Sequence, residues 1–112
     1  MRERRKLERK YLAFFTRVFN SKSDQVLGHL VNLSTKGLML LSEQPIPTQK
    51  VFHLSMDLSE TFFDKARLTF TARSVWCQPD IDPNFWNTGF HLADPTPEDL
   101  AIIERIIEAY GS

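Results

Sequence analysis

The chain has 112 residues, no formal net charge at neutral pH, 42% hydrophobic residues and 25% charged residues. This composition is typical of a globular domain and excludes collagen-like, low-complexity and largely disordered classes, and the length predicts a single domain. No apolar run approaches the roughly 18 residues of a membrane-spanning helix, so we expect no membrane insertion. The single cysteine, Cys77, excludes an intrachain disulfide and a cysteine-based zinc site, and it favours a reducing, cytoplasmic location.

The charge is unevenly distributed along the chain. Residues 1–10 hold six basic and two acidic residues, a net of +4, whereas residues 11–112 hold eight basic and twelve acidic residues, a net of −4. We therefore expect residues 1–10 to form a flexible basic arm that binds an anion locally, and residues 11–112 to form the folded part of the single domain.

Three strands are expected in the first half of the chain. Residues 11–19 are rich in aromatic and β-branched side chains, which favours a strand, and residues 26–33 and 38–41 are the next two apolar runs. The intervening residues 34–37 predict a tight turn in which Gly37 adopts a positive φ.

Three further strands are expected in the second half. Residues 51–58 alternate apolar and polar side chains, as a half-buried strand does. Residues 66–77 alternate in the same way, but their phase then changes, which indicates a β-bulge near Ser74. A loop at residues 79–87 precedes a last strand at residues 88–93.

The end of the chain predicts one helix. Thr96 is a suitable N-cap, Pro97 suits the first helical position, and Glu98 and Asp99 favour the positive end of the helix dipole. One apolar stripe follows, formed by Leu100, Ile103, Ile107 and Tyr110. The expected fold is all-β, with six or seven short antiparallel strands that close as a small barrel and one C-terminal helix.

No catalytic or metal-binding arrangement is visible. The three histidines are scattered, no nucleophile stands at a suitable spacing from a base, and no phosphate-binding glycine loop occurs. The acidic run that begins at Asp80 lacks the glycine and glutamate of a calcium loop. We therefore expect a protein that is not an enzyme and has neither a metal nor a cofactor.

Two segments carry polar side chains at spacings that suit an anionic ligand. Arg5 and Arg9 are four residues apart, so both guanidinium groups lie on one side of a helix or of an extended chain. Arginine binds phosphate and the O6/N7 edge of guanine through paired donors. Asn32 and Ser34 alternate to one face at a strand end, and Gly37 permits close approach of a ligand. Each segment alone is more typical of a solvated tail or an ordinary hairpin.

Together the two segments resemble the RxxxR and [D/N]xSxxG motifs of the PilZ domain family. They stand here as RKLER at residues 5–9 and NLSTKG at residues 32–37. The SVW at 74–76 and the GFH at 89–91 resemble further positions of the family, so the resemblance covers about residues 2–110.

This resemblance implies an antiparallel β-barrel with a C-terminal helix that binds the bacterial second messenger cyclic di-GMP. It implies that Arg5 and Arg9 bind guanine edges and phosphates from the arm, and that Asn32 and Ser34 bind the ligand from the barrel. It also implies that Gly37 preserves the turn. The arm is then expected to become ordered when the ligand binds.

Two further residues and one departure belong to the same interpretation. Trp76 matches a family tryptophan near the ligand site. Arg4 precedes the arginine pair and adds a third cation, which predicts two stacked ligand molecules per chain. Asn32 stands where the family also has aspartate, and it offers one carbonyl acceptor in place of two carboxylate oxygens. No output domain is expected, so the signal would pass to an unknown downstream protein.

Two alternatives remain open at this stage. The chain could be an adaptor with the PilZ fold that binds proteins and no nucleotide. It could also be a small barrel that binds single-stranded nucleic acid through its basic arm. The net negative charge of residues 11–112 argues against the second, so no nucleic-acid partner is expected.

Overall fold

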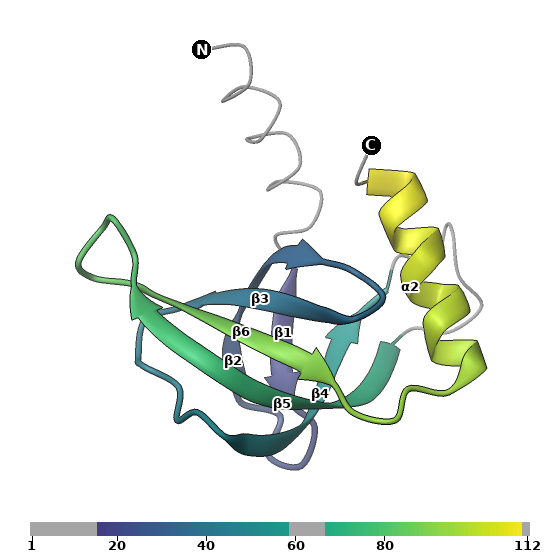
Figure 1. Ribbon diagram of the computed structural model, residues 1–112, viewed down its shortest axis with the longest axis horizontal. Helices are drawn as coiled ribbons and strands as arrows, with labels where there is room; N and C mark the ends of the chain where they lie inside the picture. The colour runs from purple at the N-terminus through teal and green to yellow at the C-terminus, as the bar shows by residue number, and fades with distance from the viewer. Residues whose placement is uncertain (1–15, 59–66, 111–112) are drawn as a thin grey trace, which may run out of the picture.

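The computed structural model describes residues 16–58 and 67–110, and in these residues six strands form a closed antiparallel barrel followed by one helix (Figure 1). The strand order is β1-β2-β3-β6-β5-β4, and β4 pairs with β1 to close the barrel. The elements are β1 Arg17–Asn20, β2 Val26–Leu33, β3 Gly37–Ser42, β4 Lys50–Asp57, β5 Arg67–Pro79, β6 Trp86–Leu92 and α2 Pro97–Tyr110. This confirms the expected fold class. The arm at residues 1–10 lies outside the described residues.

The barrel interior is filled by apolar side chains that alternate along each strand. The fully buried ones are Val18, Leu30, Leu40, Leu54, Leu68 and Phe90. Helix α2 contributes to the same core through Ile103 and Ile106, which are 1% and 3% exposed. Ile102 and Ile107 pack against the same cluster, so the helix covers the barrel with one apolar face. Figure 1 shows α2 beside the barrel.

The start of α2 has the expected cap. The Thr96 hydroxyl accepts a hydrogen bond from the Asp99 backbone N–H at 3.0 Å, and the Asp99 carboxylate accepts one from the Thr96 N–H at 3.4 Å. This reciprocal pair is a capping box, which satisfies two N–H groups that have no partner within the helix. In the described part of the chain, no helix is long and apolar enough to cross a membrane.

Three local expectations are wrong. Ser55, a polar position of the alternating strand at residues 51–58 and so expected on its outer face, is only 1% exposed; it pairs with Phe19 of the neighbouring strand, which is itself only 7% exposed. The loop expected at residues 79–87 is shorter, since β5 continues to Pro79 and β6 begins at Trp86. Residues 11–15 of the first expected strand lie outside the described residues, but its other bounds differ, since Thr16 is not in the strand and β1 extends to Asn20.

The strand pairing shifts in register at three places, one of them between Val18 and Phe19 of β1. The other two are bulges in β5 and β2 that change which way these strands present their side chains. In β5 the register shifts between Ser74 and Trp76, which confirms the bulge expected near Ser74. A second bulge, which the sequence did not predict, shifts the register of β2 between Leu30 and Asn32. Ser74 and Leu30 point into the barrel, so without the extra residue Trp76 and Asn32 would point inward as well. The bulges instead place both on the outside.

A pocket on the outer barrel face

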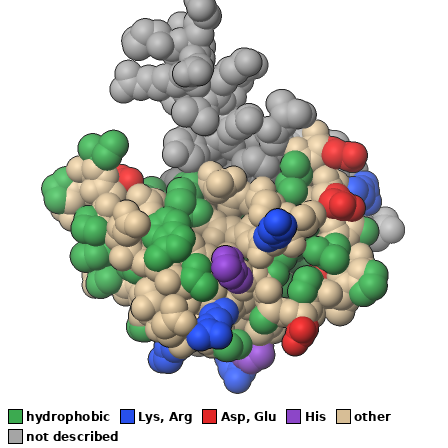
Figure 2. All heavy atoms as spheres, in the orientation of Figure 1, with side chains coloured by type: hydrophobic (Ala, Val, Ile, Leu, Met, Phe, Trp, Pro, Cys, Tyr) green, Lys and Arg blue, Asp and Glu red, His purple; other side chains and the backbone are tan. Residues whose placement is uncertain are grey.

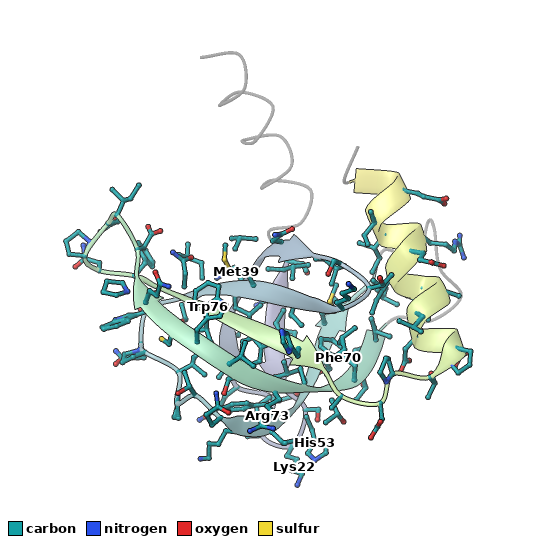
Figure 3. The ribbon with its side chains drawn as sticks, viewed as in Figure 1. Lys22, Met39, His53, Phe70, Arg73 and Trp76 are labelled. Carbon is teal, nitrogen blue, oxygen red and sulfur yellow. The ribbon has the colours of Figure 1, made fainter. Side chains whose placement is uncertain are left out.

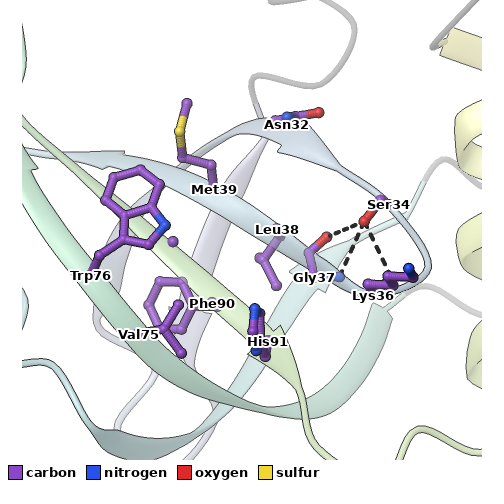
Figure 4. Close-up of a pocket in the computed structure, with 11 residues that line it drawn as sticks. Asn32, Ser34, Lys36, Gly37, Leu38, Met39, Val75, Trp76, Phe90 and His91 are labelled. Carbon is purple, nitrogen blue, oxygen red and sulfur yellow. Dashed lines mark hydrogen bonds between the residues drawn. The ribbon is translucent and has the colours of Figure 1, made fainter.

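Asn32 and Trp76, which the bulges turn outward, stand at the two ends of one row of paired residues across four strands. Asn32 of β2 pairs with Met39 of β3, Met39 pairs with Gly89 of β6, and Gly89 pairs with Trp76 of β5. All four line a pocket of about 260 Å³ (Figure 4), and the turn between β2 and β3 continues its wall with Ser34. The sequence prediction that Asn32 and Ser34 face the same side is consistent with their place in this wall.

Ser34 organises the turn between β2 and β3. Its hydroxyl accepts hydrogen bonds from the backbone N–H groups of Lys36 and Gly37, each at 3.2 Å, and donates one to the Gly37 carbonyl at 3.4 Å (Figure 4). The Ser34 N–H also donates to the Gly37 carbonyl at 2.8 Å. The sequence prediction of a tight turn at residues 34–37 is therefore confirmed.

The expectation of a positive φ at Gly37 is wrong, since no glycine in the described part of the chain has one. A glycine is required there for a different reason. Gly37 lies directly beside the Phe90 backbone of β6, and a Cβ would collide with the Phe90 carbonyl oxygen. The close approach that the sequence suggested is thus to a neighbouring strand of the barrel.

Asn32 is exposed at the pocket rim. Its side-chain oxygen accepts a hydrogen bond from the Leu33 backbone N–H at 2.9 Å, which fixes the plane of the amide. One lone pair of this oxygen and the two N–H donors of the amide are directed elsewhere. Asn32 can therefore present both a donor and an acceptor to a ligand at the rim.

Trp76 forms the opposite end of the pocket and is 38% exposed. Its indole ring lies against the backbone of Gly89, where a Cβ would collide with the ring atoms. The ring is thus held by β6, and one of its sides stays accessible at the pocket (Figure 4). An accessible indole face is a surface on which a nucleobase can stack.

The remaining predicted site residues, Arg4, Arg5 and Arg9, lie outside the described residues. Several pocket residues were not predicted to bind the ligand, and the two basic ones among them are Lys36 and His91. Lys36 stands within the second motif at a variable position, and His91 enters the pocket because it pairs with Gly37 across β3 and β6. A pairing between residues 54 positions apart has no signal in the sequence pattern.

No group of three or more His, Cys, Asp or Glu side chains that could hold a metal ion occurs among the described residues. Cys77 is half-buried, and its sulfur accepts a hydrogen bond from the Thr88 hydroxyl at 3.3 Å.

Comparison with known proteins identifies the fold of the chain. The model of the PilZ domain matches residues 3–109, and no curated protein matches the chain in sequence. The barrel is similar to the PilZ domain with c-di-GMP of YcgR from Escherichia coli, with 15% identity and a TM-score of 0.63 over 86% of this chain and 82% of that chain.

A second similar structure is the PlzA protein of Borreliella burgdorferi in complex with c-di-GMP, with 13% identity and a TM-score of 0.54. The match covers 91% of this chain and 48% of PlzA, so this chain corresponds to about half of that protein. The family model covers nearly the whole sequence and the barrel has the fold of solved PilZ structures, so the chain belongs to the PilZ domain family.

Proposed function

We propose that this protein is a non-enzymatic receptor for cyclic di-GMP, which binds over the pocket on the outer barrel face. The observation that carries the proposal is the single pocket wall formed by Asn32, Ser34 and Trp76, which come from two separate parts of the sequence. Membership of the PilZ family supports it, as do the two similar structures solved with this ligand.

Each group has a distinct role in this proposal. The Trp76 indole stacks on one guanine, and the Asn32 amide binds the polar edge of a base. The arm closes over the ligand, with Arg5 and Arg9 binding phosphate and the guanine O6/N7 edge. Ser34 holds the turn, and its hydroxyl reaches the ligand by exchanging one of its turn bonds.

The proposal extends to stoichiometry and signalling. Arg4 adds a third cation, which offsets the repulsion between the phosphates of two stacked ligand molecules, so we place two molecules on each chain. The ordered arm and ligand then form a new surface that a downstream protein in the bacterial cytoplasm recognises.

The test is calorimetry with cyclic di-GMP on the wild-type protein and on Arg5→Ala and Arg9→Ala. Each variant loses a charge-assisted pair of hydrogen bonds worth about 1.5–3 kcal/mol, so affinity falls by roughly ten- to a hundredfold or more. The melting temperature without ligand should stay within about 2 °C, because the sequence predicts both arginines in a polar arm ahead of the first strand. The matched control is Lys22→Ala, which removes an exposed cation outside the pocket, and Figure 3 shows Lys22 well away from the pocket residues Met39 and Trp76.

Two results count against the receptor proposal. Unchanged affinity in both arginine variants removes the arm from the binding site. Binding of a short single-stranded oligonucleotide with no binding of cyclic di-GMP or GTP would favour the nucleic-acid alternative.

A further inference from the structure

The motif serine is fully occupied by its own turn. A hydroxyl group has one hydrogen to donate and two lone pairs that accept. The Ser34 hydroxyl uses all three within residues 34–37, with bonds of 3.2–3.4 Å. While the turn is intact, Ser34 has no hydrogen-bonding capacity left for an anion and can reach a ligand only by giving up one of these bonds. A phosphate beside the intact turn therefore needs other side chains.

Lys36 and His91 both line the end of the pocket that is formed by the turn between β2 and β3. The Leu92 N–H donates to the Lys36 carbonyl at 2.9 Å, and His91 pairs directly with Gly37, so Lys36, in the turn before β3, lies beside the end of β6 that carries His91. Both are exposed and both line the pocket, as Figure 4 shows. Among the described residues that line it, they are the two whose side chains carry or can carry a positive charge.

A third basic residue, Arg73, lies next to His91 on the strand opposite Gly37. Arg73 of β5 pairs with His91 across the sheet and is exposed, and its guanidinium donates one hydrogen bond of 2.7 Å to Gln49. In Figure 2, Lys, Arg and His side chains follow one another down the middle of this face. The first carboxylate after His91 in the chain is Asp94, and within the described part of the chain it forms no ion pair with His91.

We propose that Lys36 and His91 form a phosphate subsite of this pocket, that Arg73 adds positive charge from the next strand, and that ligand binding takes up a proton at His91. This inference rests on the proposed function and deepens it. Neither the arm arginines nor the fixed positions of the second motif take part in the subsite.

The subsite makes affinity depend on pH. Imidazole is the side chain that changes its charge between about pH 5 and 8, whereas the ammonium of Lys36 and the guanidinium of Arg73 remain charged there. The phosphodiesters and guanines of cyclic di-GMP also keep their charge over this range. A phosphate beside His91 favours the protonated ring, so binding takes up a proton and affinity rises as pH falls.

The experiment is calorimetry with cyclic di-GMP at pH 6, 7 and 8 and constant ionic strength. The wild-type protein should bind roughly 3- to 10-fold more tightly at pH 6 than at pH 8, the ratio that one added charge contact gives near a protein surface. The binding enthalpy at pH 7 should vary with the ionisation enthalpy of the buffer in proportion to the protons taken up.

Matched variants assign the effect to the subsite. His91→Gln should lose the pH dependence and the proton uptake, whereas His53→Gln, an exposed histidine of β4 outside the pocket, should retain both. Lys36→Gln should weaken binding by a similar factor at every pH, and Lys22→Gln should not. Melting temperatures confirm that each variant is folded.

The outcomes separate the two proposals. If the wild-type protein binds cyclic di-GMP with a pH dependence that His91→Gln retains, or with none at all, the subsite is wrong and the receptor proposal stands. If the folded wild-type protein does not bind cyclic di-GMP at any pH, the receptor proposal fails and the subsite fails with it.

Discussion

Two glycines on the neighbouring strands β3 and β6 shape the pocket, because at each position a Cβ atom would collide with another part of the sheet. Gly37 lies against the Phe90 carbonyl, and Gly89 lies beneath the Trp76 ring. The first brings β3 close to β6, and the second lets the indole lie flat on the sheet. Neither glycine is needed for a positive φ.

Substitution of Gly37 tests the first of these contacts. Gly37→Ala places a methyl group against a backbone oxygen that cannot turn away, so β3 and β6 must separate. The free energy of unfolding, measured by urea denaturation, should fall by about 2–3 kcal/mol. The exposed neighbour provides the control, since Lys36→Ala should change it by less than about 0.5 kcal/mol. An equal midpoint for Gly37→Ala and the wild-type protein would contradict the packing argument.

The indole of Trp76 should report on ligand binding. In a Trp86→Phe background, saturating cyclic di-GMP should shift and quench Trp76 emission, because a stacked guanine replaces water on the exposed ring face. Gly89→Ala forces the ring off the sheet, so it should weaken both binding and the fluorescence change. If emission does not change at ligand saturation, Trp76 has a packing role and no contact with the ligand.

At the scale of the elements, the hairpin between β5 and β6 is fixed by one carboxylate. Asp80 accepts a 2.8 Å hydrogen bond from the Asn87 side-chain amide. This bond lowers the pKa of Asp80 most strongly, burial opposes it, and backbone N–H groups of Asp82 and Ile81 add to the lowering. The loop thereby holds Ile81 fully exposed at its tip.

The Asp80–Asn87 bond should make hairpin stability depend on pH. A lowered pKa stabilises the folded state above the ordinary carboxyl range near 4 and loses this contribution as pH falls through the folded pKa. Asn87→Ala should therefore raise the pKa of Asp80, as seen by NMR titration of its carboxyl carbon. It should also lower the melting temperature at pH 7, and this difference should shrink toward pH 3. The control, Asn84→Ala, removes an amide from the same loop, and an Asp80 pKa that responds equally to both changes would refute the assignment.

At the scale of the whole molecule, exposed ion pairs connect segments that are distant in the sequence, in addition to the contacts of the buried core. Arg67 of β5 binds Asp24, in the turn after β1, at 3.1 Å and Asp57 of β4 at 3.3 Å. These contacts raise the pKa of Arg67, with the hydrogen bond to Asp24 the largest cause. Its guanidinium also lies 4.9 Å from the centre of the Phe19 ring, so one side chain bridges three strands.

The proposed number of ligands per chain depends on the arm and the barrel together. Calorimetry should give a molar ratio near two, because three arm arginines offset the charge of two stacked ligand molecules. Arg4→Leu removes one of these cations and should move the ratio toward one, whereas Lys22→Leu should leave it unchanged. A ratio of one for the wild-type protein ends the stacked-dimer proposal at any affinity.

Local patterns determined most of the fold. Period-two alternation identified β4 and β5, apolar runs identified β2 and β3, the cap at Thr96 located the helix start, and the change of phase after Ala72 indicated the bulge in β5. These features depend on residues within about ten positions of one another, so the sequence reports them directly. The two motifs indicated the family because their residues and spacing stand unbroken in the chain.

The tertiary structure alone decided how the pocket is built. The bulge that turns Asn32 outward, the oxygen that makes Gly37 necessary, and the place of His91 beside Lys36 all depend on which strands pair and in what register. Register in a closed barrel is set by all six strands together, and a shift of one residue turns every side chain to the opposite face. The sequence therefore determined the kind of ligand to expect, while the closed sheet decided which side chains line the pocket.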